Sequence, residues 1–113
     1  MRKGLAMYLA AEADLCVVGE AADGPTALDL ATRFCPDIVL VDVEMPSMDG
    51  IAMTSTLHID CPQVSVIILS IHDDVFALKR AAQAGAAAFV DKSMPADTLL
   101  TTIRQVVHQK SSI

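Results

Sequence analysis

A run of four apolar residues that ends in a carboxylate constrains this chain most. Residues Ile38 to Val41 are apolar and mostly β-branched, they follow a turn sequence at residues 35–37, and Asp42 comes directly after them. Such a run, bounded by turn residues, is typical of a strand buried on both faces of a parallel sheet. Asp42 would then lie at the carboxyl end of that strand, the edge at which open α/β sheets bind ligands. A carboxylate there is costly unless a cation or a reaction uses it.

Two further apolar runs end in polar residues of the kinds that phosphoryl chemistry needs. Residues 64–69 lead into Ser70, and residues 87–90 lead through Asp91 into Lys92. If the three strands are parallel neighbours, a carboxylate, a hydroxyl and an ammonium meet at one edge. The carboxylate can attack a phosphoryl group, the hydroxyl can donate to a phosphoryl oxygen, and the ammonium can offset its charge.

Apolar runs and amphipathic segments alternate along the whole chain. Strands are expected at residues 15–19, 38–42, 64–69 and 87–90, and helices at 2–12, from 24, at 50–59, up to 84 and from 95. This βα alternation predicts one α/β domain over residues 1–108, with a parallel sheet, helices on both faces and a frayed tail at 109–113.

Three sequence motifs resemble those of the receiver domains of bacterial response regulators, with the NarL type as the most similar subgroup. They are DIVLVDVEMPSMDG, VSVIILSIHDD and AGAAAFVDK, in receiver order and spacing. The resemblance implies a flavodoxin-like doubly wound sheet and two-component signalling in the cytoplasm. It also implies Asp42 as the phosphoacceptor, Ser70 and Lys92 as phosphate-contacting residues, and Ser70 and Phe89 as switch residues. A sensor histidine kinase would be the phosphoryl donor, and an output domain outside this chain would bind DNA and regulate transcription.

The chain differs from that family at its amino end. The family begins with a central strand that ends in two acidic Mg²⁺ ligands, whereas this sequence begins with a helix pattern, as if truncated. By resemblance, only the Asp42 carboxylate and the backbone carbonyl of Glu44 remain to hold the cation. Because Mg²⁺ is usually bound by one or two carboxylates with waters and phosphate oxygens, we expect weak binding or none.

A sheet without its central strand would lose much of its core and leave two strand edges unpaired. We therefore expect one of two arrangements. Either the strand at residues 15–19 slides against the Asp42 strand, or a second copy closes the gap in a homodimer or strand-swapped oligomer.

Three functions compete at this stage. The first is a phosphorylated signalling receiver, and the alternative is a receiver-like interaction or dimerisation module that works without phosphorylation because its metal site is incomplete. An enzyme is disfavoured, since the sequence contains neither a glycine-rich phosphate loop nor a nucleophile with an adjacent base.

The composition of the chain limits the kinds of partner that it is expected to bind. The formal net charge is −6 and the basic residues do not cluster, so this chain by itself is not expected to bind DNA. No apolar run approaches the length of a membrane span. The cysteines at positions 16, 35 and 61 fit no metal spacing and are expected to be buried thiols in a reducing compartment.

Overall fold

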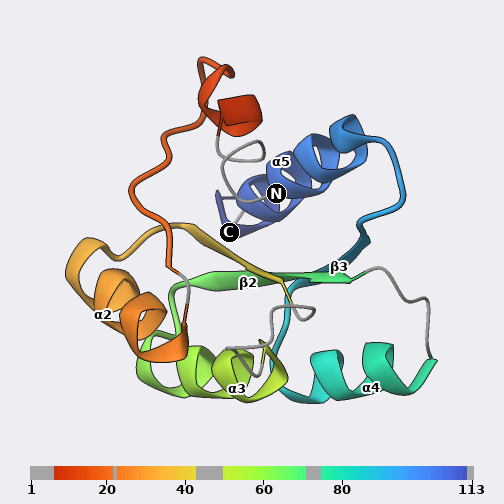
Figure 1. Cartoon of the computed structure of the whole chain (residues 1–113). Coiled ribbons are helices and arrows are strands. Elements are labelled where there is room, and N and C mark those ends of the chain that lie inside the picture. Colours follow the sequence, from red (N-terminus) through yellow and green to blue (C-terminus); the bar gives the residue numbers. More distant parts are fainter. Residues whose placement is uncertain (1–6, 22, 43–49, 71–74, 112–113) are drawn as a thin grey trace.

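The chain forms a three-layer α/β structure in a computed structural model that describes residues 7–21, 23–42, 50–70 and 75–111. Helices cover both faces of a parallel sheet (Figure 1). The sheet order is β1-β2-β3, with the strands β1 (Ile38–Asp42), β2 (Ser65–Ser70) and β3 (Ala88–Asp91). The helices are α2 (Gly24–Phe34), α3 (Gly50–Asp60), α4 (Val75–Gln83) and α5 (Ala96–Ser111). The predicted parallel sheet with helices on both faces is confirmed.

The strand register brings the three strand ends to one edge. Asp42 lies opposite Leu69 on β2, and Ser70 lies opposite Asp91 on β3. Both pairings are parallel, so the carboxyl ends of all three strands point the same way. The edge predicted to carry the chemistry therefore exists.

The sheet separates two apolar clusters that hold the layers together. On the side of α2, α3 and α4, the fully buried Leu57 contacts strand residues such as Val66 and Ile68. On the α5 side, Ile67 of β2 packs with Ile103 and its helical neighbours. Successive residues of β2 thus face opposite apolar clusters, so the strand is buried on both faces, as its continuous apolar run predicts. Both clusters rigidify β2, which lies at the centre of the described sheet.

Local sequence signals explain where α2 begins and ends. The Asp23 side chain accepts a hydrogen bond of 2.8 Å from the Thr26 backbone amide, and Pro25 occupies the first turn. Both are favourable at a helix amino terminus. Cys35 ends the helix with a left-handed φ of 43°. The predicted start of this helix is confirmed.

A left-handed glycine follows α4. Gly85 has a φ of +101°, and a Cβ at this position would lie 2.5 Å from the His58 ring. Both the backbone conformation and the close approach of the ring therefore require glycine.

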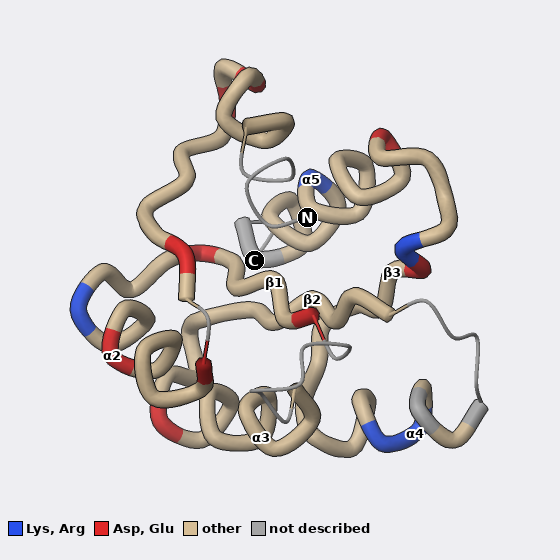
Figure 2. Tube along the Cα trace, in the orientation of Figure 1, with Lys and Arg blue, Asp and Glu red and all other residues tan. Residues whose placement is uncertain are grey.

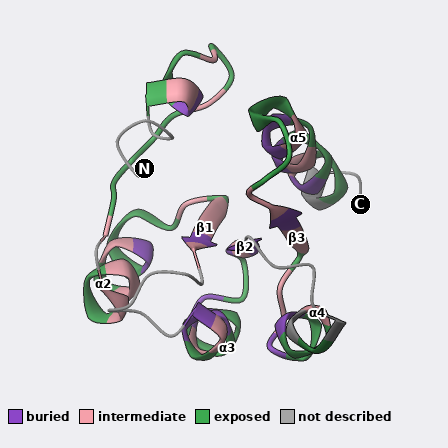
Figure 3. Cartoon of the chain, turned by 45° about the vertical axis from the view of Figure 1, so that its right-hand side comes forward, coloured by how far each residue is buried: buried purple, intermediate pink, exposed green. Residues whose placement is uncertain are grey.

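The predicted strand at residues 15–19 is wrong. Residues 15–21 form no regular secondary structure, and the segment passes from the helical turn at residues 7–10 to α2 without pairing with β1 (Figure 3). Val17 and Val18 are 39% and 49% exposed. The apolar pattern of residues 15–19 is that of a strand. A strand also needs a hydrogen-bonding neighbour, and the described residues supply none for this segment. The expectation that this segment slides against β1 is therefore also wrong.

Smaller expectations changed as well. Helix α5 continues to Ser111, three residues beyond the predicted end at residue 108. Cys61 is buried, but Cys16 and Cys35 are exposed, so the prediction of three buried thiols is wrong for those two. Residues 1–6, at the start of the helix predicted at 2–12, lie outside the described residues.

The described helices include none that is both long enough and apolar enough to cross a membrane.

Candidate functional site

An ion pair links the ends of the two outer strands. The Lys92 Nζ donates to Asp42 Oδ2 at 2.8 Å, although the two residues are 50 positions apart in the sequence. The Lys92 and Asp42 side chains are only 14% and 15% exposed. Partial burial strengthens such a pair because water screens it less. The structure thus brings two of the predicted site residues into direct contact.

Ser70 lies at the same edge, at the end of the central strand. It is 2% exposed, and its backbone carbonyl accepts a 2.8 Å hydrogen bond from the Lys92 amide. No buried side-chain nitrogen or oxygen among the described residues lacks a hydrogen-bond partner, so the hydroxyl is satisfied. The backbone bond ties the start of the Lys92 segment to β2, and this helps to direct the ammonium back across the sheet towards Asp42.

A compact turn after β3 holds Lys92 in place. Asp91 Oδ1 accepts hydrogen bonds from the Ser93 amide at 2.8 Å and from the Ser93 hydroxyl at 2.7 Å. The Met94 amide also donates to the Asp91 carbonyl at 3.1 Å. An aspartate that bonds the backbone two residues on is a common turn device. Asp91 therefore shapes the loop that carries Lys92.

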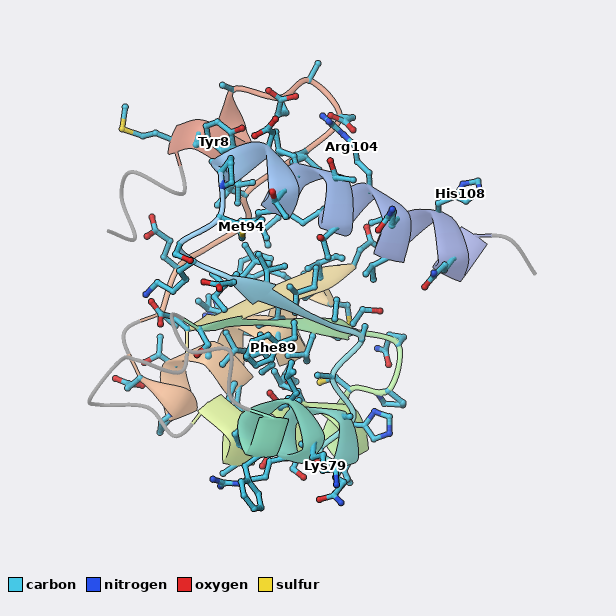
Figure 4. The ribbon with its side chains drawn as sticks, turned by 90° about the vertical axis from the view of Figure 1, so that its right-hand side faces the viewer. Tyr8, Lys79, Phe89, Met94, Arg104 and His108 are labelled. Atoms are coloured by element: carbon cyan, nitrogen blue, oxygen red, sulfur yellow. The ribbon has the colours of Figure 1, made fainter. Side chains whose placement is uncertain are left out.

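Phe89, the predicted aromatic switch residue, is half-buried on β3. It packs against the apolar cluster on the side of α3 and α4, and Figure 4 shows it below the sheet on that side. It lies opposite Ile68 on β2. This position suits a core aromatic residue as well as a switch, so the switch role stays a prediction.

The described residues do not form a strong cation site. They include no group of three or more histidine, cysteine, aspartate or glutamate residues placed to hold a metal. At the edge, Asp42 is bound to an ammonium, and Asp91 accepts from Ser93. Glu44, whose carbonyl was the other predicted ligand, lies outside the described residues. The described part of the chain thus does not fit a tightly held Mg²⁺.

A second ionic cluster links the amino-terminal segment to α5. Arg104 donates to Glu12 at 2.7 Å and to both carboxylate oxygens of Asp14 at 3.0 Å (Figure 4). The hydrogen bonds from Arg104 lower the pKa of the Asp14 carboxyl, and those carboxylates raise the pKa of Arg104. Unlike the Lys92–Asp42 pair, this cluster is exposed to solvent.

Basic residues form no patch on the described chain. Figure 2 shows lysine and arginine distributed over α2, α4, α5 and the segment after β3, with acidic residues between them. This distribution lacks the concentrated positive charge of a nucleic-acid surface.

Two features of the site were not predicted from the sequence. One is the Lys92–Asp42 ion pair itself, since Lys92 was expected to meet a phosphate rather than the carboxylate. The other is the turn formed by Asp91 and Ser93, for which the Asp-x-Ser spacing was an available signal.

Known proteins resemble this chain over nearly all of its length. A family model described as the response regulator receiver domain matches residues 1–104. The transcriptional regulatory protein DegU from Brevibacillus brevis is 35% identical over 105 residues, which cover 93% of this chain and 44% of that protein. The response regulator protein VraR from Staphylococcus aureus is 32% identical over 111 residues, which cover 98% of this chain and 53% of that protein. The chain spans about half the length of these curated relatives.

Solved structures share the fold. The signal receiver domain of a NarL response regulator from Mycobacterium tuberculosis is 30% identical, with a TM-score of 0.83, and the match covers 99% of this chain and 88% of that one. A LuxR-family two-component response regulator from Aurantimonas is 28% identical, with a TM-score of 0.89, and the match covers 96% of this chain and 77% of that one.

Proposed function

Because this chain belongs to the response regulator receiver domain family, we propose that Asp42 accepts a phosphoryl group and that Lys92 and Ser70 hold it. The resemblance found in the sequence, including the NarL-type subgroup, is confirmed by the family model and by the NarL and LuxR-family neighbours. The observation that carries the proposal is the 2.8 Å contact between the Asp42 carboxylate and the Lys92 ammonium at the carboxyl edge of the sheet.

The proposed step is a simple displacement at phosphorus. An Asp42 oxygen attacks the phosphorus of a phosphohistidine, the new O–P bond forms, and the N–P bond breaks to release the imidazole. The product is an acyl phosphate on Asp42. Its added charge attracts the Lys92 ammonium, which shifts from the carboxylate to a phosphoryl oxygen. The buried Ser70 hydroxyl, at the end of the neighbouring strand, supplies a donor to a second oxygen.

The partners of this step are also proposals. A sensor histidine kinase would donate the phosphoryl group, and Mg²⁺ would bind weakly to Asp42 and the Glu44 carbonyl. The chain would act as a cytoplasmic signalling module rather than as an enzyme. It would self-associate, and it would affect transcription through a DNA-binding output domain outside these residues.

A second candidate is an interaction module that works without phosphorylation. One observation favours it: the described residues contain no cluster of three or more histidine, cysteine, aspartate or glutamate residues that could hold a metal ion. In that case the ion pair would close the edge of the sheet, and a partner would recognise the unmodified surface.

Phosphorylation with acetyl phosphate and Mg²⁺ separates the two candidates. We expect the unmodified chain to gain one phosphoryl group by intact mass and Asp42→Asn to gain none. Asp60→Asn is the matched control, because Asp60 is an exposed carboxylate at the carboxyl end of α3 and has no part in the proposed site. Equal uptake by Asp42→Asn would refute the assignment, and no uptake by any of the three proteins would favour the second candidate.

A further inference from the structure

The Lys92 ammonium reaches Asp42 across the end of the central strand β2. Asp42 ends β1 and Lys92 follows β3, so their strands lie two strand spacings apart, about 9–10 Å. Asp42 is level with Leu69 of β2, and Leu69 is level with Val90 of β3. Lys92 lies two residues beyond Val90, which lengthens the span further. Because the aspartate side chain is short, the lysine stem must cover most of this distance, and the 2.8 Å contact leaves it little freedom. The ion pair therefore requires that the Lys92 backbone be held close to one position.

Hydrogen bonds on both sides of Lys92 hold its backbone. The Lys92 amide donates to the Ser70 carbonyl at 2.8 Å, which fixes the segment against β2. Asp91 Oδ1 accepts from the Ser93 amide at 2.8 Å and from the Ser93 hydroxyl at 2.7 Å, which closes a turn around Lys92. Ser93 and Met94 are exposed, so burial contributes little to the shape of this turn. Its hydrogen bonds, and the Asp91 side chain above all, therefore define where the lysine stem begins.

We propose that Asp91 is a positioning residue for the phosphoryl transfer, because it closes with Ser93 the turn that keeps Lys92 within reach of Asp42. This inference rests on the proposed phosphorylation of Asp42. Charge develops on the phosphoryl oxygens in the transition state, and a cation that already lies at the Asp42 carboxylate needs only a small shift to meet them. A loosened turn would spread the ammonium over many positions, so fewer molecules would hold it correctly when the donor arrives.

The charge of Asp91 offers a second explanation that the test must separate from the first. A carboxylate next to Lys92 also adds negative charge to the edge of the sheet. Asparagine distinguishes the two effects, since it keeps an acceptor oxygen on a side chain of the same length but carries no charge. Asp97→Ala is the matched control, because it removes one exposed carboxylate from the first turn of α5 and leaves the Asp91 turn intact.

The rate of phosphoryl uptake from acetyl phosphate, followed by intact mass, measures the effect. We expect Asp91→Ala to lower the rate at saturating donor by at least about tenfold, since a small displacement of a group near the reacting atoms slows a reaction strongly. The half-saturating donor concentration should change by less than about twofold, because the positioned cation acts mainly in the transition state. Asp91→Asn should recover most of the rate, and Asp97→Ala should retain all of it.

NMR of the Lys92 ammonium measures the positioning without any phosphoryl donor. Ammonium protons that are held in a hydrogen bond exchange slowly with water, and the Lys92 signal is assigned by its loss in Lys92→Ala. We expect this signal in the unmodified chain and in Asp91→Asn, and its loss in Asp91→Ala. No uptake by the unmodified chain would refute the proposed function, whereas a Lys92 signal that Asp91→Ala leaves intact would refute the positioning.

A milder variant keeps the test decisive if Asp91→Ala does not fold. Ser93→Ala removes the exposed hydroxyl but keeps the Ser93 amide as a donor to Asp91, so uptake should slow by about threefold, as the loss of one hydrogen bond implies. Uptake by Ser93→Ala and Asp91→Ala at the rate of the unmodified chain would overturn the inference. So would an Asp91→Asn variant as slow as Asp91→Ala, because the charge of Asp91 rather than its turn would then control the rate.

Discussion

Two ionic clusters in this molecule use similar groups in opposite surroundings. The Lys92–Asp42 pair lies at the carboxyl edge of the sheet, with side chains that are 14% and 15% exposed. The Arg104 cluster joins the amino-terminal segment to α5, with side chains that are 34–56% exposed. Withdrawing charges from water is expensive, and exposed pairs contribute little to stability. The Lys92–Asp42 pair is mostly buried and costs desolvation. It is therefore more informative about function than the exposed Arg104 cluster, although that cluster has more hydrogen bonds.

The largest predicted stability effect concerns the enclosed pair. Lys92→Ala should lower the free energy of unfolding by about 1–3 kcal/mol, because it leaves a mostly buried carboxylate without its charged donor. Urea denaturation of the variant and of Lys79→Ala, an exposed lysine on α4 (Figure 4), measures the difference. A Lys92→Ala variant as stable as Lys79→Ala would show that the pair contributes nothing.

Salt should separate the two clusters. Raising the ionic strength from about 0.1 to 1 M shortens the screening length from about 10 to 3 Å, so exposed pairs weaken most. The destabilisation caused by Arg104→Ala should then disappear, while that caused by Lys92→Ala should largely persist. Denaturation of both variants and the unmodified chain at the two salt concentrations provides the comparison. Equal salt sensitivity would mean that the Lys92–Asp42 pair is as hydrated as the Arg104 cluster.

These predictions also show how far the sequence could be interpreted. The apolar run before Asp42 predicted β1 and its polar end, because a strand that is buried on both faces is apolar at consecutive residues. The helix predicted from residue 24 likewise begins there, since the Asp23 cap is a local interaction. The position of Lys92 beside Asp42 followed from the parallel sheet, but the ion pair depends on the reach of one side chain and on the Asp91 turn.

The wrong strand has a different cause. The apolar pattern at residues 15–19 is suitable for a strand, and the sequence cannot say whether a neighbour is present to pair with it. Val17 and Val18 therefore remain partly exposed in a segment without regular structure. The exposure of Cys16 and Cys35 follows from the same open region, because both residues line a groove beside β1.

The smallest predicted effect is a pH dependence in the exposed cluster. Hydrogen bonds from Arg104 lower the pKa of Asp14 below its usual 3.8 in the folded chain. A lowered folded pKa means that the interaction stabilises the chain above pH about 4 and is lost as the pH falls through the folded value. The stability difference between the unmodified chain and Arg104→Ala should thus be constant near neutrality and shrink in acid. A difference that grows as the pH falls would contradict this sign.

The central claim is that Asp42 is the residue that receives phosphate, and chemical mapping on the unmodified chain tests it most directly. Hydroxylamine attacks the carbonyl carbon of an acyl phosphate, releases inorganic phosphate and leaves a hydroxamate on the same side chain. After treatment with acetyl phosphate and Mg²⁺, peptide mass spectrometry should find that hydroxamate at Asp42, and should find it only when the donor was present. A hydroxamate at Asp91 or at another carboxylate, or phosphate on the chain that hydroxylamine does not release, would contradict the account.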